Sequence, residues 1–234
     1  MSSRKLTRSI VVGAAAIAVA GGSYGIVSAT SSGASPAASS GSAGRFGPGG
    51  GGSNARSGPA AGGAAGTVSS VSNSKFTMTT SAGQKVTVGE ASSTTYQKET
   101  SLTSASAIAT GKTVLVLGTT SGSTITATQV IVQRASSGGS ATSPAAKVIP
   151  FQRGAPTTSK QVGQIPASYS QGSGTIVNGT AAHMATEAAL TAYPGGIVDR
   201  VVELSNGEYE VHNIGVNWPH HVFVNQDFKV TGAD

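Results

Sequence analysis

Two histidines and a glutamate near the end of the chain are the residues whose types and spacing best suit chemistry. If the strands that carry them pair as neighbours, His212 lies directly opposite His221, and Glu210 lies two residues from His212 along one strand. Two imidazoles and a carboxylate at this spacing suit a zinc or copper ion. The sequence therefore predicts a metal site at Glu210, His212 and His221. The alternative is a solvated sheet face, because a register slip of one residue separates the two histidines.

The strands that position these side chains lie after residue 196. Apolar runs predict strands at 197–204, 209–213, 221–225 and 228–230. Asn206-Gly207 favours a two-residue type I′ turn between the first two strands.

This turn decides which residues share a face of the sheet. It places Leu204 opposite Tyr209 and Val202 opposite Val211. Pairing Val211 with Val222 then gives one apolar face, made of Val202, Leu204, Tyr209, Val211, Val222 and Val224. The other face carries Val201, Glu203, Glu210, His212, His221 and Phe223.

An alanine-rich helix is predicted just before the sheet, at residues 180–193. Pro194-Gly195-Gly196 ends it, because proline cannot continue a helix and glycine suits the left-handed cap. We expect this helix to pack on the apolar face of the sheet, through a side made of Ala181, Met184, Ala185, Ala188, Ala189 and Ala192.

The order of these elements resembles a PepSY domain over residues 175–234. The residues that carry the resemblance are Ala188-Ala189-Leu190, Tyr193-Pro194-Gly195-Gly196, the segments 198–202 and 207–211, Val222-Phe223-Val224 and Phe228-Lys229-Val230. The resemblance implies a small α+β domain, with one helix on an antiparallel sheet. It also implies peptidase inhibition, or control of the protein environment near the cell surface.

The chain departs from that pattern at residues 213–221, where an apolar loop replaces the usual charged turn. Trp218 in this loop is either a lid on the edge of the core or an exposed anchor for a partner. Phe223, on the face opposite the helix, is the second candidate for partner binding.

Residues 66–134 form a different predicted module. Strands are expected at 67–71, 75–80, 85–88, 113–117 and 125–132, and short strands with regular turns predict a small closed or nearly closed antiparallel barrel. The order of Gly66-Thr67-Val68, residues 76–80, Val86-Thr87-Val88, Gly111-Lys112-Thr113-Val114 and residues 125–130 resembles a small β-barrel family of unknown function that is common in exported bacterial proteins. The resemblance supplies no catalytic residues. The predicted fold class is thus multi-module.

Two linkers are expected between these parts. Of the 36 residues from Thr30 to Ala65, 31 are Gly, Ala, Ser or Pro, and such a segment buries too little apolar area to offset the entropy of ordering. A similar composition predicts a second disordered linker at 135–174.

The first 29 residues have the layout of a secretory signal peptide. Arg4, Lys5 and Arg8 precede an apolar run that begins at Ile10, and small residues favour cleavage after Ala29. The alternative is a membrane anchor at residues 10–26. Either outcome predicts a secreted protein or one of the extracytoplasmic cell envelope.

The net charge of +6 is unevenly distributed. Residues 1–180 are basic, whereas residues 181–234 carry seven acidic and two basic side chains. The bases are scattered among Ser and Gly and aromatic residues are few, which argues against a nucleic-acid partner. Adhesion to anionic cell-wall polymers or to a membrane surface is the expected consequence of the basic part.

No constellation of an enzyme is recognisable in the sequence. It lacks a His-Glu-x-x-His helix, a Gly-x-Ser-x-Gly elbow and a phosphate-binding loop, and it contains no cysteine. The sequence therefore predicts an exported, non-catalytic protein that binds or restrains a peptidase or another envelope partner, with no cofactor beyond the hypothetical zinc or copper ion. The alternatives are a structural or adhesive cell-wall-associated protein and a metal-responsive envelope sensor.

Overall fold

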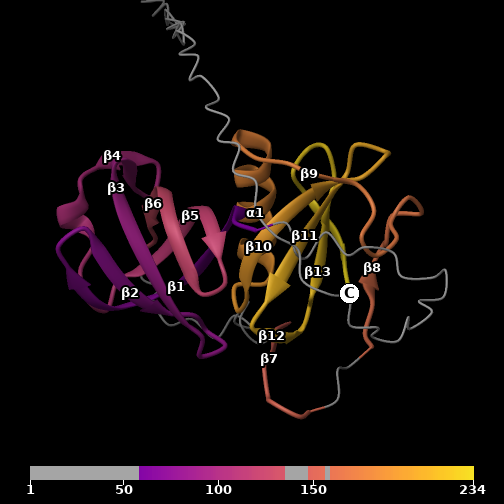
Figure 1. The fold of residues 1–234 in the computed structure, drawn as a ribbon, viewed down its shortest axis with the longest axis horizontal. Helices are drawn as coiled ribbons and strands as arrows, with labels where there is room; N and C mark the ends of the chain where they lie inside the picture. The colour runs from indigo at the N-terminus through magenta and orange to yellow at the C-terminus, as the bar shows by residue number, and fades with distance from the viewer. Residues whose placement is uncertain (1–57, 135–146, 156–158) are drawn as a thin grey trace, which may run out of the picture. The chain divides into compact units, whose positions relative to one another are not determined.

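The computed structural model describes residues 58–134, 147–155 and 159–234 (Figure 1). These residues are mostly β-strand with a single α-helix, as the sequence predicts. The elements in chain order are β1 (Ala60–Ser72), β2 (Lys75–Thr79), β3 (Lys85–Lys98), β4 (Ser101–Thr103), η2 (Ala105–Ala107), β5 (Thr113–Ser121), β6 (Thr124–Val132), β7 (Ile149–Pro150), β8 (Val162–Gly163), β9 (Thr175–Ile176), α1 (Thr180–Ala192), β10 (Ile197–Glu203), β11 (Tyr209–Ile214), β12 (Val216–Trp218), β13 (His221–Val224) and β14 (Val230–Ala233).

The predicted signal peptide or anchor and most of the first predicted linker lie outside the described residues. Within the described part of the chain, no helix has both the length and the apolar character that crossing a membrane requires.

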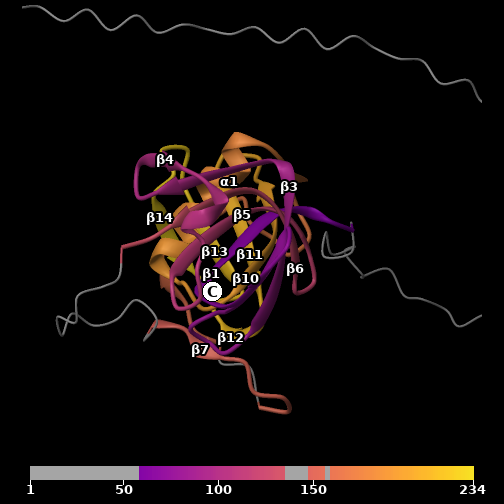
Figure 2. The same ribbon diagram turned by 90° about the vertical axis from the view of Figure 1, so that its left-hand side faces the viewer.

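Five strands of the first half pair in a closed circuit, in the order β1, β2, β3, β6, β5 and back to β1 (Figure 2). The prediction of purely antiparallel pairing is wrong, because β3 and β6 run parallel. Five strands cannot alternate in direction around a closed circuit, so one neighbouring pair has to be parallel. Buried side chains from the circuit share one core, which includes Val68, Phe76, Met78, Val86, Val88, Val114, Val116, Ile125 and Val130.

Strand β1 begins earlier than the sequence predicts. Residues 60–65, expected in a linker, are strand, and Gly63 and Ala64 pair with β5 on one edge and with β10 on the other. A Cβ atom on Gly62 would overlap the carbonyl oxygen of Val198, and one on Gly63 would overlap that of Val116. The small residues that suggest a linker are therefore what this closely packed strand requires.

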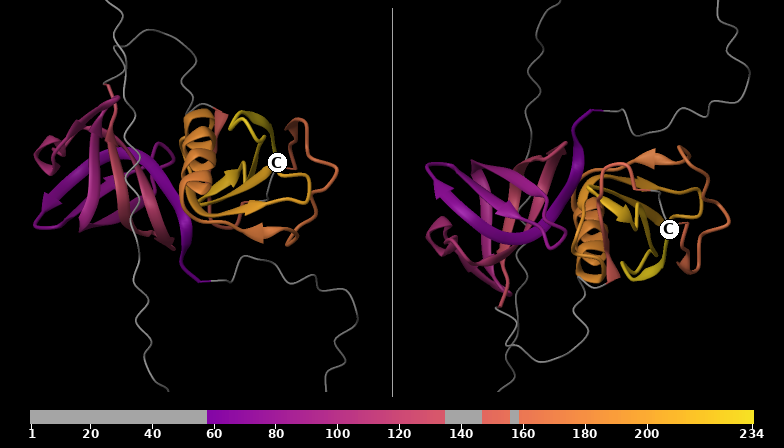
Figure 3. Two further views of the ribbon diagram at one scale, coloured as in Figure 1. Left: turned by 90° about the horizontal axis from the view of Figure 1, so that it is seen from above. Right: turned by 90° about the horizontal axis from the view of Figure 1, so that it is seen from below.

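The second half is a sheet in the order β10, β11, β13, β14, with α1 packed against one face (Figure 3). The helix is confirmed, and so is part of its predicted buried side, since Ala185 and Ala189 are buried and Ala188 and Ala192 pack against the same core. Met184 is 43% exposed, whereas Ala182, Ala185, Thr186, Ala189 and Leu190 are buried. The helix contacts β1 and β5 as well as β10, β11 and β13, and these additional contacts rotate its buried side.

The predicted linker at 135–174 is only partly tested. Residues 135–146 and 156–158 lie outside the described residues, whereas β7 and β8 pair with β12 and β14 respectively. Parts of the segment therefore form strand pairs, contrary to the prediction.

His183 on α1 provides a pH test of this packing. Its Nε2 lies 3.4 Å from Thr128 Oγ1, and burial lowers its pKa below the ordinary value of 6.5. Because the unfolded chain then binds the proton more tightly, His183 should reduce stability as the pH falls through 6.5. We expect His183→Gln to lose less free energy of unfolding than the wild type between neutral and acidic pH, measured by urea denaturation. Parallel pH curves for the two proteins would contradict this.

Candidate functional site

The hairpin between β10 and β11 differs from the predicted two-residue turn. The amide of Leu204 donates to Glu208 O at 2.8 Å, which leaves residues 205–207 as a three-residue loop. Gly207 has a φ of 78° and supplies the left-handed residue that such loops need. The register is therefore shifted by one, and Val201, not Val202, lies opposite Val211.

The shift changes which β10 side chains accompany the histidines. Val201 belongs to the core beneath α1, and Arg200 lies opposite His212. A register irregularity between Val198 and Arg200 makes Asp199 an extra residue in the strand. Asp199 and Arg200 thus come close to His212, although neither was predicted as a site residue.

The pairing of β11 with β13 agrees with the sequence prediction. His212 lies opposite His221, Val211 opposite Val222, and Tyr209 opposite Val224. The imidazole rings of His212 and His221 have centroids 5.2 Å apart. The prediction came from pairing Val211 with Val222, which places Tyr209, Val211, Val222 and Val224 on one face of the sheet.

Each of the two histidines is paired with its own carboxylate. His212 Nδ1 lies 2.6 Å from Asp199 Oδ1, and His221 Nδ1 lies 2.7 Å from Glu210 Oε1. The Glu210 side chain is 3% exposed, so its carboxylate is nearly removed from solvent. Glu210 therefore hydrogen-bonds one imidazole, and the described residues contain no group of three or more side chains placed to hold a metal ion. The predicted three-ligand site is not assembled in that form.

Arg200 is buried beside the first of these pairs. Its Nη1 lies 2.9 Å from His212 Nδ1 and 3.4 Å from Asp199 Oδ2. The nitrogen Nδ1 cannot both accept from Arg200 and donate to Asp199, and we assign donation to Asp199 because that contact is the shorter. Arg200 then compensates the carboxylate charge.

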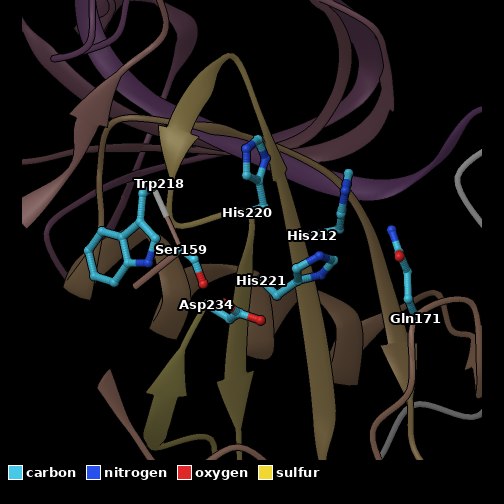
Figure 4. Close-up of a pocket in the computed structure, with 7 residues that line it drawn as sticks. All are labelled: Ser159, Gln171, His212, Trp218, His220, His221 and Asp234. Atoms are coloured by element: carbon cyan, nitrogen blue, oxygen red, sulfur yellow. The ribbon is translucent and has the colours of Figure 1, made fainter. Parts of the chain in front are cut away.

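An open pocket of about 360 Å³ lies over the histidines, and its lining residues are Ser159, Gln171, His212, Trp218, His220, His221 and Asp234. Figure 4 shows the histidines between Trp218 on one side and Gln171 on the other. The pKa of His220 is lowered, chiefly by burial.

Residues 159–174, here called the strap, supply part of the pocket wall. Trp218 Nε1 donates to Lys160 O at 2.6 Å, and Val162 and Gly163 pair with β14. The Tyr169 ring lies 4.8 Å from the Phe223 ring and 5.5 Å from that of His221, between centroids. Burial, followed by the charges of Glu210 and Asp234, raises the pKa of Tyr169 well above its usual range.

The strap buries the two side chains predicted to bind a partner. Trp218 is 2% exposed and packs edge-on against Tyr193, and Phe223 is completely buried. The prediction of exposed anchors is therefore wrong for both residues. Trp218 is instead the lid on the core edge, the alternative that the sequence left open.

The sequence prediction missed two pairs of site residues. Tyr169 and Gln171 lie in a low-complexity segment, where nothing marks them out from their neighbours. Asp199 and Arg200 did leave a signal, because adjacent charged residues interrupt an otherwise apolar strand.

Comparisons of the chain with protein-family models, curated proteins and solved structures find no match. The resemblances to a PepSY domain and to the small β-barrel family therefore stay predictions.

Proposed function

We propose that the chain is an exported, non-catalytic binding protein of the bacterial cell envelope. In this proposal the closed circuit of strands is a small barrel module, and residues 175–234 form a PepSY-like module that binds or restrains a peptidase or another envelope partner. The supporting observation is the pocket over His212 and His221, whose wall is completed by the strap.

The size and chemistry of the pocket define what it accommodates. About 360 Å³ is enough for one side chain or a small ligand, and far too little for a folded domain. The carboxylates of Asp199, Glu210 and Asp234 lie near the histidines. Their negative charge exceeds the positive charge of the Arg200 guanidinium. A partner would thus insert a polar or basic side chain, and its main contacts would lie on the rim.

The proposal is tested by blocking the pocket from its rim. Gln171 is exposed and lines the pocket, so Gln171→Trp should obstruct entry without touching the histidines. The matched control is Gln152→Trp, at another exposed glutamine that does not line this pocket. The exported chain, immobilised in the presence of EDTA, is exposed to an envelope extract, and its effect on secreted peptidase activity is assayed in parallel.

We expect the wild type and Gln152→Trp to retain the same envelope protein and to lower peptidase activity, and Gln171→Trp to do neither. Equal retention and equal inhibition by all three proteins would count against the pocket. No retained protein and no inhibition by the wild type would count against the proposed function.

A further inference from the structure

We infer that the pocket binds one divalent transition-metal ion, with Nε2 of His212 and Nε2 of His221 as its two protein ligands. The inference deepens the proposed function by naming a ligand of the same pocket, and it rests on that pocket being the binding site. It differs from the three-ligand site predicted by the sequence, because Glu210 does not bind the ion. Glu210 instead hydrogen-bonds the ligand His221, as Asp199 hydrogen-bonds the ligand His212.

The hydrogen bonds prepare both rings for coordination. Each Nδ1 donates to a carboxylate, at 2.6 Å for His212 and 2.7 Å for His221. This fixes the tautomer and leaves the lone pair on Nε2, to which no described residue donates a hydrogen bond. A carboxylate behind a ligating imidazole also increases its basicity, and this is the usual environment of histidine ligands in metal sites.

The separation of the rings suits one shared ion. A zinc ion lies about 2.0–2.1 Å from a coordinating imidazole nitrogen, which puts it about 3.2 Å from the ring centroid. For an ion in line with Nε2 of both rings, centroids 5.2 Å apart would subtend an angle of about 110°, which is close to tetrahedral. Two coordination positions remain open to water or to a donor atom from a partner.

The surrounding charge favours a cation. Asp199, Glu210 and Asp234 bring three carboxylates to the pocket region, against the two positive charges of Arg200 and of Lys160, whose ammonium lies 4.5 Å from the centroid of the Trp218 ring. Imidazole ligands suit zinc and copper among the divalent ions. The buried position of Glu210 strengthens its interaction with a bound ion, because the local dielectric constant is lower than that of water.

The test is calorimetric titration of the metal-free, untagged full chain with Zn²⁺, repeated with Cu²⁺. We expect one ion per chain, and affinity at least tenfold weaker in His212→Asn and in His221→Asn. Asp199→Asn and Glu210→Gln should each weaken binding by about 10-fold or more, since loss of a supporting carboxylate costs 10- to 100-fold. Circular dichroism of every metal-free variant establishes that it is folded.

Another histidine provides a matched control. His183 lies on α1 and does not line the pocket. His183→Asn should bind Zn²⁺ as the wild type does.

Absence of binding to the wild type would overturn the metal site, as would a loss of affinity in His183→Asn equal to that in His212→Asn. Because partner capture is assayed in EDTA, either result leaves the proposed function to be judged on its own experiment.

Discussion

Replacing Gly63 by alanine is expected to lower the free energy of unfolding by about 3 kcal/mol or more, at the upper end of the cost of overpacking. The added Cβ would overlap the carbonyl oxygen of Val116 and come within 3.3 Å of Thr186 Cγ2 on α1. Strand β1 cannot move away from β5 to relieve this overlap, because Gly63 also pairs with Val198 of β10. Urea denaturation followed by circular dichroism measures the loss.

Gly89→Ala is the matched control, because Gly89 is also a strand glycine of the same half. The nearest atom to its added Cβ is Ile125 O at 4.0 Å, an ordinary contact distance. Alanine should be neutral or stabilising there by about 0.5–1 kcal/mol, since glycine is unfavourable within a strand. Similar destabilisation by both substitutions would show that close approach of backbones is not what requires glycine in β1.

Phe223→Ala is expected to lower the free energy of unfolding by about 3–5 kcal/mol, the range for removing a buried aromatic ring. Phe223 is completely buried, and the edge-on packing of Tyr169 against it is one of the contacts that order the strap. The substitution should therefore also loosen the cover of Trp218, the only tryptophan in the chain. Denaturant unfolding gives the first effect, and a red shift of the tryptophan emission gives the second.

Leu102→Ala is the control for Phe223→Ala, because Leu102 is 82% exposed and its truncation should change stability by less than about 0.5 kcal/mol. If Phe223 were an exposed partner anchor, its truncation would also leave stability nearly unchanged. Equal stability of Phe223→Ala and Leu102→Ala would thus refute the buried role.

The sequence predicts well where side-chain pattern alone decides the structure. Tyr209, Val211, Val222 and Val224 can share one face of the sheet, and the pairing that puts Val211 opposite Val222 also puts His212 opposite His221. Helix α1 was predictable because Pro194 marks its end and alanine favours helix.

The sequence predicts poorly where several local structures suit the same residues. Asn206-Gly207 suits a two-residue turn and a three-residue loop, and the choice moved Val201 to the face beneath α1. Small residues before residue 66 suit a linker and a tightly packed strand equally well. Only the neighbouring backbones, which lie far away in the sequence, decide between these alternatives.

Strand β1 has a consequence for how the molecule folds. Its glycine-rich end hydrogen-bonds to β5 of the closed circuit and to β10 of the helix-covered sheet. Removing it would open the circuit and at the same time leave an unpaired edge on β10, which invites aggregation. We therefore expect the two halves to unfold in a single cooperative transition, and neither to be an autonomous folding unit when cut out at the boundary that composition suggests.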